Sequence, residues 1–250
     1  MGGVIMAKHS ELFGLLGEYQ VLRHQNPKGA KECDHNGQIE FVFECNAIER
    51  NSLALEQVKN VIENGVTTVS MDNREELETA GLNDAMNYVN KLIDDDINLS
   101  ESIVKELHSI LYVGASNDFK GQYRSDFITI PHAQNLPPVR HISYFMNKLF
   151  DEYKEMGQLD IIERIALFHV KFENIHPFQD GNGQVGRLII NYQLIRAGYP
   201  PIAIKAEDKK AYIKAFEKYN RELDIEPMVE ILINALKDEL NKRIKCLRVE

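Results

Sequence analysis

Apolar side chains recur at every third or fourth position along most of this chain, a spacing typical of amphipathic helices. The pattern predicts helices over residues 8–25, 53–64, 74–95, 101–111, 139–156, 158–174, 183–195, 208–223 and 226–247. Turn-forming residues separate most of these stretches, and no internal repeat is present. The sequence therefore predicts a mostly helical, all-α fold.

Three segments depart from the helical pattern. Residues 26–37 are rich in Gly, Asn, Pro and charged side chains, and they predict a loop. Residues 38–44 mix β-branched and aromatic side chains with imperfect alternation, so they fit either a strand or the start of a helix. Residues 127–130, Phe-Ile-Thr-Ile, predict a short strand that stops at Pro131.

Composition narrows the class of protein. With 250 residues the chain can bury a core, and its formal net charge of −9 argues against the basic patch of a nucleic-acid-binding protein. Its three cysteines are far apart and lack metal-ligand spacing, so we expect reduced thiols at Cys33, Cys45 and Cys246. The apolar start is too short for a signal peptide, and no apolar run approaches a membrane span. We expect a soluble, cytoplasmic protein, while export by a machinery that reads no such signal stays open.

The largest concentration of candidate functional side chains lies in the run IHPFQDGNGQVGR, residues 175–187. The residue before a proline is disfavoured in the αR region, so the His176-Pro177 step ends one predicted helix. Gly181 and Gly183 allow a tight turn, and the next helix offers free N–H groups and a positive dipole end to an anion. An imidazole, a carboxylate, an amide and a guanidinium surround this turn: His176, Asp180, Asn182 and Arg187. These groups supply a base, a metal ligand and a phosphate clamp, whereas Asp-Gly-Asn-Gly alone would fit an ordinary turn.

This run resembles the signature of the Fic family, His-Pro-Phe-x-(Asp/Glu)-Gly-Asn-Gly-Arg-x-x-Arg, at every fixed position except the first arginine. Most members of that family transfer AMP from ATP to a hydroxyl side chain of a target protein. The resemblance implies that His176 is the general base, that Asp180 binds Mg²⁺ and that Arg187 holds the terminal phosphate. It also implies nucleotide and phosphate contacts from Gly181, Asn182, Gly183 and Gln184, the last replacing the missing arginine.

A second resemblance lies upstream of this run. The inhibitory-helix motif of many Fic proteins, (Ser/Thr)-x-x-x-Glu-(Gly/Asn), matches at Glu49 and Asn51, whereas Cys45 and Arg50 replace the usual Ser or Thr and the usual Gly. In the family this glutamate pairs with the second arginine of the signature, here Arg187, and blocks productive seating of the terminal phosphate. The resemblance therefore implies an inhibitory Glu49, although the residues alone would fit an exposed glutamate on a solvated helix.

The resemblance also places two further features and the domain limits. A hairpin flap beside the active-site loop, which holds the target by strand addition, would include Ile128, Thr129 and Ile130; a small structural hairpin fits the same residues. Tyr212 and Asn220 fall where Fic proteins contact adenine, and both also fit surface positions. The expected organisation is an N-terminal helix and loop (1–37), a Fic domain (38–225) with its inhibitory helix at about 44–64, and a C-terminal helix (226–250).

The resemblance implies an autoinhibited protein adenylyltransferase that uses ATP and Mg²⁺ to modify a Ser, Thr or Tyr hydroxyl, on a target protein or on itself. Some relatives with this glutamate also remove AMP, and others transfer UMP, phosphocholine or phosphate. Gln184 supports a different class, a nucleotide-binding regulatory module, because an uncharged amide forgoes a charge-assisted hydrogen bond worth about 1.5–3 kcal/mol. His176, Asp180 and Arg187 remain, which favours the enzyme. The target and the oligomeric state, including a homo-oligomer, stay open, and neither nucleic acid nor a membrane is expected as a partner.

Overall fold

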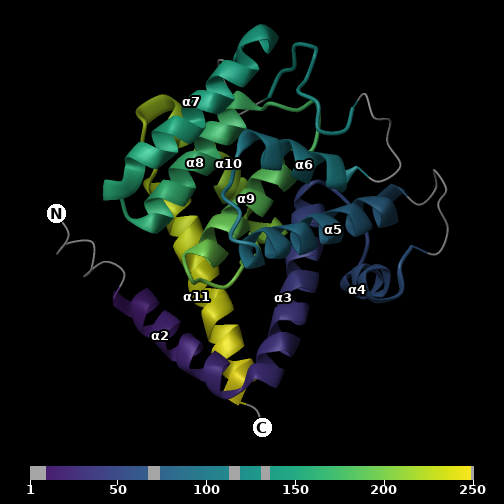
Figure 1. Cartoon of the computed structure of the whole chain (residues 1–250), viewed down its shortest axis with the longest axis vertical. Helices are drawn as coiled ribbons and strands as arrows, with labels where there is room; N and C mark the ends of the chain where they lie inside the picture. The colour runs from purple at the N-terminus through teal and green to yellow at the C-terminus, as the bar shows by residue number, and fades with distance from the viewer. Residues whose placement is uncertain (1–9, 67–73, 113–118, 131–135, 249–250) are drawn as a thin grey trace.

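A computed structural model describes residues 10–66, 74–112, 119–130 and 136–248 of the chain. These residues form ten α-helices and three short 3₁₀-helices, which confirms the all-α class (Figure 1). In chain order the elements are α2 (Ser10–Gln25), α3 (Pro27–Ile48), α4 (Leu55–Asn64), α5 (Arg74–Asp94), α6 (Glu101–Leu111), η2 (Val139–His141), α7 (Ile142–Glu155), η3 (Met156–Gln158), α8 (Ile161–Ile175), α9 (Asn182–Arg196), η4 (Ala206–Asp208), α10 (Lys209–Glu222) and α11 (Glu226–Arg248). Among these helices, none combines the length and the apolar character needed to cross a bilayer.

Helix α9 lies at the centre of the molecule (Figure 1). It contacts α3, α5, α6 and α8, and 12 of its 15 residues are buried. A helix that is covered on all sides needs apolar residues around its whole circumference, and α9 supplies them with Val185, Leu188, Ile189, Ile190 and Leu194. The loop between α8 and α9 is therefore carried by two well-packed helices.

Two apolar clusters flank this central pair of helices. One joins α8 and α9 to α2, α10 and α11, and the other joins them to α5, α6 and α7. Because α8 and α9 contribute side chains to both clusters, they are held from two sides.

The loop expected over residues 26–37 is wrong, because α3 is unbroken through that segment. Its start is well specified: the Asn26 side chain accepts a hydrogen bond from the Gly29 N–H at 2.9 Å, and Pro27 begins the helix, where its missing N–H has no cost. Residues 38–44, which fitted a strand or a helix, are helical and pack against α5. The Gly and Asn content suggested a loop, but burial between neighbouring helices stabilises α3 against that local preference.

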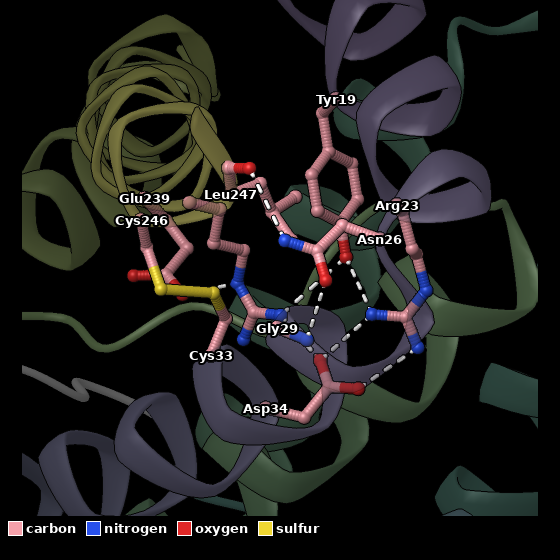
Figure 2. Close-up of a disulfide and its surroundings, with 10 residues drawn as sticks. Tyr19, Arg23, Asn26, Gly29, Cys33, Asp34, Glu239, Cys246 and Leu247 are labelled. Atoms are coloured by element: carbon pink, nitrogen blue, oxygen red, sulfur yellow. Dashed lines mark hydrogen bonds and ion pairs between the residues drawn. A yellow bond between two sulfur atoms is a disulfide. The ribbon is translucent and has the colours of Figure 1, made fainter. Parts of the chain in front are cut away.

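Cys33 and Cys246, expected as reduced thiols, form a disulfide that joins α3 to α11 (Figure 2). The two residues are 213 positions apart in sequence, yet the turn between α2 and α3 meets the end of α11 and brings their Cα atoms to 6.6 Å (Figure 1). Beside the bond, the buried Arg243 guanidinium donates to Asp34, which also accepts from Arg23. Only the fold brings these thiols together, so sequence spacing could not reveal the pair.

The strand expected over residues 127–130 is not formed in the part of the chain that the structure describes. Residues 127–129 belong to no regular element, and Ile130 makes a single bridge. Residues 131–135, where the rest of a hairpin flap would lie, are outside the described residues. A four-residue apolar run becomes a strand only with a partner for its N–H and C=O groups, and periodicity alone cannot supply that information.

Candidate active site

His176 ends α8 in a left-handed backbone conformation, with φ 47° and ψ 64°. This conformation costs a non-glycine residue about 1–2 kcal/mol, so neighbouring contacts must hold it. Arg124, only 2% exposed, supplies them: its Nε donates to the His176 carbonyl at 2.9 Å, and its backbone N–H donates to the Pro177 carbonyl at 2.8 Å. The His176 side chain remains 16% exposed. The imidazole is therefore presented on a fixed turn with access to solvent.

The rest of the loop is fixed from inside by Phe178 and Asn182. Phe178 is fully buried and stacks on His108, with 3.9 Å between the ring centroids. The Asn182 side chain accepts from the Phe178 N–H and donates to the Phe178 carbonyl, both at 2.9 Å. The amide that we expected at a phosphate is thus engaged in closing the loop, and the backbone N–H of Asn182 is the group left for a ligand.

His108 holds the loop from α6. The Gly121 N–H donates to its Nδ1 at 2.9 Å, so Nε2 carries the proton and donates to the Asp180 carbonyl at 3.2 Å. Burial lowers the pKa of His108 to about 4 from 6.5, against a smaller opposite effect of Asp180. The ring is therefore a neutral part of the loop's support.

A pH dependence of stability follows from His108. The unfolded chain takes up a proton at this ring below pH 6.5, and the folded chain does so only near its pKa of about 4, so stability is lost as pH falls through that window. We expect His108 to remove about 2 kcal/mol of unfolding free energy between pH 7 and pH 5. Urea unfolding at both pH values measures this loss, which His108→Gln should diminish and His35→Gln, at an exposed site on α3, should retain. Equal losses in wild type and His108→Gln would assign the effect to another group.

Asp180 lies on the exposed side of the loop. Its Oδ1 accepts from the Gly181 N–H at 2.9 Å, and its charge is a secondary cause, after burial, of the raised pKa of Tyr112. Gly181 has φ 77°, and a Cβ there would meet the Tyr112 hydroxyl at 2.7 Å, so the turn requires glycine. Among the described residues, no three His, Cys, Asp or Glu side chains gather to hold a metal. One hard carboxylate oxygen beside a helix N-terminus, which would favour a phosphate, nevertheless fits Mg²⁺, which usually binds one or two carboxylates together with substrate phosphates.

The N-terminus of α9 follows Asp180 directly, and a second carboxylate, that of Glu49, lies against its first turn. No side chain caps the helix, so its first N–H groups lack the usual capping partner. Gly183 lies in that turn, and a Cβ at this position would fall 2.5 Å from Oε1 of Glu49 and 3.0 Å from Nη1 of Arg187. The Glu49 carboxylate therefore lies against the first turn of α9, where a phosphate would be favoured.

Arg187 joins α9 to the end of α3. Its Nη2 donates to Glu49 Oε1 at 2.7 Å, so the pair expected from the sequence is present as a contact. Its Nε also donates to the Cys45 sulfur at 3.1 Å, and Nη2 to the Cys45 carbonyl at 3.2 Å. Cys45 is a buried free thiol, and burial raises its pKa, so it stays protonated. Arg187 is 3% exposed and the Glu49 side chain 45% exposed, which leaves the carboxylate as the member of the pair that solvent can reach.

Gln184 makes a second bond between the same helices. Its Nε2 donates to Asn46 Oδ1 at 3.2 Å, and Asn46 Nδ2 donates to Thr79 Oγ1 at 3.0 Å. All three side chains are buried. The glutamine that replaces the usual arginine is therefore engaged with α3, so its side-chain amide is already in use.

The segment after α3 differs from the single inhibitory helix expected at about residues 44–64. The chain leaves α3 through a Schellman-type turn, in which the Asn51 N–H donates to the Asn46 carbonyl and the Arg50 N–H to the Ala47 carbonyl, both at 3.1 Å. α4 begins only at Leu55. This turn ends the helix directly after Glu49 and so sets where its carboxylate lies.

Arg50 occupies the left-handed position of this turn, with φ 72°, which glycine favours. We expect Arg50→Gly to raise the free energy of unfolding by about 0.5–1 kcal/mol, because the strain removed exceeds the entropy added to the unfolded chain. Urea unfolding measures the gain. Arg50→Ala is the matched control, and an equal gain there would show that the arginine side chain, not its backbone, is the cause.

The two residues expected at adenine lie on α10, next to α8. Tyr212 is buried and its hydroxyl is hydrogen-bonded to His169, so it is not a surface residue. Asn220 exchanges hydrogen bonds of 2.7 and 3.1 Å with Asn174. A pocket of about 500 Å³ lies beside this pair and the end of α8, lined among others by Pro137, Asn174, Ile175 and Tyr219. Contact with adenine stays a prediction for both residues.

Sequence reasoning gave no role to Arg124, His108 or Glu173. All three are buried polar side chains next to the loop, and Arg124 also donates to the Asp126 and Pro137 carbonyls at 3.2 and 2.7 Å. Arg124 therefore ties the loop to both ends of the segment that includes Ile128, Thr129 and Ile130. Polar or charged residues also occur among their sequence neighbours, so nothing along the chain marks these three side chains as buried.

Comparison with known proteins identifies the family of the domain. A family model described as Fic/DOC family matches residues 98–194. The protein adenylyltransferase Fic of Nematostella vectensis is 31% identical over 201 residues, which cover 78% of this chain and 46% of the relative. The protein of the same name from Drosophila melanogaster is 25% identical over 221 residues, covering 87% of this chain and 44% of the relative. The chain thus spans somewhat less than half the length of these two relatives.

Solved structures show the same fold. A Fic-domain-containing signalling protein from Bacteroides thetaiotaomicron superposes with a TM-score of 0.84 at 27% identity, covering 96% of this chain and 98% of that one. Fic-1 from C. elegans superposes with a TM-score of 0.78 at 22% identity, covering 98% of this chain and 75% of that one, and shows the fold alone. This chain carries a Fic/DOC family domain in an all-α, Fic-type helical fold.

Proposed function

We propose that the chain is an autoinhibited protein adenylyltransferase, which transfers AMP from ATP to a Ser, Thr or Tyr hydroxyl. The single observation that supports this best is the contact of Glu49 with both Arg187 and the first turn of α9. A carboxylate there takes the place that a nucleotide phosphate would need. The names of the relatives, protein adenylyltransferase Fic, support the reaction class.

In the proposed reaction, His176 takes the proton of the incoming hydroxyl as its oxygen attacks the α-phosphorus of ATP. A new O–P bond forms, the bond from the α-phosphorus to the bridging oxygen breaks, and pyrophosphate leaves. The free N–H groups at the start of α9 stabilise the charge on the phosphate oxygens. Asp180 would hold Mg²⁺, which neutralises phosphate charge when bound.

Autoinhibition follows from the contacts of Arg187. Its guanidinium is shared between Glu49 and Cys45, so it is not free to hold a terminal phosphate. A nucleotide phosphate would also need the space beside Gly183, and Glu49 occupies that space while it lies against this glycine. Because the Glu49 side chain is 45% exposed, it can be displaced without opening the core.

One observation supports the second candidate, a nucleotide-binding regulatory module with little catalysis. The Gln184 amide is bonded to Asn46, so Arg187 would be the one signature cation facing the phosphates. A cation lost at this point weakens phosphate binding by roughly ten- to a hundredfold. His176, Asp180 and Arg187 are all present in the chain, which favours the enzyme.

The experiment incubates wild type and Glu49→Gly with ATP, UTP and GTP in the presence of Mg²⁺ and reads self-modification by intact-protein mass spectrometry. The adenylyltransferase predicts a gain of one AMP with ATP, larger in Glu49→Gly. A gain with UTP or GTP would keep the reaction class and change the donor. Nucleotide binding by calorimetry without any mass gain, in either protein, would favour the regulatory module.

The metal site has its own test in the Glu49→Gly background. Asp180→Ala should lower ATP affinity about tenfold or more when Mg²⁺ is present and change it little when the metal is chelated, because the metal joins this carboxylate to the phosphates. Calorimetric titration in both conditions measures the difference. Asp151→Ala, at an exposed site on α7, is the control and should behave as its parent. A Mg²⁺ effect that survives in Asp180→Ala would place the metal elsewhere.

A further inference from the structure

Glu173 is a buried carboxylate that neither the expected site nor the proposed reaction uses. It lies on α8, three residues before His176, and is 4% exposed. Burying an ionised carboxylate is costly unless neighbouring groups compensate its charge. The groups that compensate the charge of Glu173 therefore indicate its role.

The nearest of these surroundings is His176 itself. Glu173 Oε2 lies 3.5 Å from His176 Nδ1. On the other side, a Cβ at Gly186 of α9 would fall 2.8 Å from Glu173 Oε1 and 2.7 Å from Cε1 of His169. Glu173 Oε1 and the His169 ring therefore both lie against Gly186, where α8 and α9 approach closely.

Three elements present titratable groups to Glu173: α8 with His169, α9 with Arg187 and α10 with Tyr212. Burial raises the pKa of Glu173, but hydrogen bonding to His176 and the charges of His176, His169 and Arg187 together bring it below its ordinary value. The carboxylate is therefore ionised at neutral pH and can only accept hydrogen bonds.

His176 Nδ1 is the ring nitrogen that meets this acceptor. In the part of the chain that is described, His176 Nδ1 has no hydrogen-bond partner apart from the 3.5 Å approach of Glu173 Oε2, and Glu173 Oε1 has none. No other group there competes for a proton on Nδ1. A carboxylate that accepts from one ring nitrogen of a histidine leaves the lone pair on the other nitrogen.

We propose that Glu173 is a positioning residue for His176: it accepts from Nδ1–H, selects that tautomer and leaves Nε2 as the nitrogen with a free lone pair. In a serine protease triad, a buried carboxylate orients the catalytic histidine in the same way. The inference rests on the proposed function for its catalytic meaning, since Nε2 then takes the proton of the incoming hydroxyl. If Glu173 were only a counter-charge for Arg187, it would leave the tautomer of His176 unaffected.

The test reads that tautomer directly. Wild type and Glu173→Met are labelled with ring-¹⁵N histidine, and the two ring-nitrogen shifts of His176 are measured in alkaline buffer, where histidine rings are neutral. The His176 signals are assigned by their loss in His176→Ala. Glu163→Met, nearer the start of α8 and partly exposed, is the matched control. Glu173→Leu replaces Glu173→Met if that variant does not fold.

We expect the Nδ1–H form in wild type and in the control, and a shift toward the Nε2–H form in the apolar variant. An Nε2–H form in wild type, or an unchanged tautomer after the carboxylate is removed, would overturn the inference.

A kinetic measurement separates positioning from a merely structural role. In the Glu49→Gly background, Glu173→Met should lower the single-turnover rate of AMP transfer about a hundredfold while ATP affinity changes little. Glu173→Gln, whose amide oxygen can still accept, should recover part of the rate. A tautomer switch that leaves the rate unchanged would overturn the positioning role. If no variant transfers AMP, the proposed function fails, and the ring-nitrogen result still decides whether Glu173 sets the tautomer.

Discussion

Replacing His176 with alanine is expected to abolish AMP transfer while nucleotide binding remains nearly intact. The imidazole acts on the incoming hydroxyl and neutralises no phosphate charge, so its loss removes the proton acceptor alone. A positioned general base contributes about a hundred- to ten-thousandfold, which sets the expected loss of rate. The measurement pairs a transfer assay with calorimetric titration of ATP, both in the Glu49→Gly background where binding is easiest to detect.

The control for this variant is His35→Ala, a histidine on the exposed surface of α3. It should transfer AMP at the rate of its parent. Loss of ATP binding in a folded His176→Ala protein would contradict the proposed role. The residue would then act by holding the left-handed turn, whose carbonyl accepts from Arg124, and not as the base.

Glu49→Gly is expected to raise AMP transfer about ten- to a hundredfold, most visibly as self-modification. The variant removes the charge-assisted hydrogen bond to Arg187 at 2.7 Å, and such bonds contribute about 1.5–3 kcal/mol. It also clears the first turn of α9, since the carboxylate no longer lies against Gly183. ATP should then bind more tightly and raise the melting temperature of the variant more than that of wild type.

The gain must depend on the arginine that is released. Adding Arg187→Ala to Glu49→Gly should erase it, and Glu56→Gly, an exposed glutamate on α4, should leave transfer at the wild-type level. If Glu49→Gly leaves transfer flat while Gln184→Arg raises it, the missing arginine is the limit and Glu49 is not inhibitory. If the variant instead loses an AMP-removing activity, Glu49 serves mainly to orient water.

Much of the helical framework can be predicted from the chain because its helices bury one regular apolar stripe. α6 shows this clearly: Ser100 caps it and Val104, Leu107 and Leu111 are buried. α3 escaped prediction over its first half because Gly and Asn favour loops locally, whereas contacts with α2, α5 and α11 stabilise the helix beyond its Asn26 cap.

The candidate site likewise has features that the sequence predicts and features that depend on packing. The residue types of the loop indicate its chemistry, and the pair between Glu49 and Arg187 has the partners expected. The sequence could not show that Asn182 and Gln184 are engaged within the protein, because which face of a loop or helix is buried depends on its neighbours. The support of the loop by Arg124 and His108 was invisible for the same reason, since each reaches it from a distant segment.

The disulfide at the start of α3 bears on how Glu49 can be released. α3 has 22 residues and is therefore about 33 Å long, with Glu49 directly after one end and Cys33 in the second turn from the other. Because the disulfide attaches α3 to α11, we expect it to oppose movement of α3 along its own axis. While the disulfide is intact, we therefore expect Glu49 to leave Arg187 by a local movement: rotation of its half-exposed side chain, unwinding of the last turn of α3 or a swing of residues 49–54. In the disulfide-bonded protein, an activator is therefore expected to bind at residues 49–54, between α3 and α4. Binding elsewhere along α3 would act against its attachment to α11.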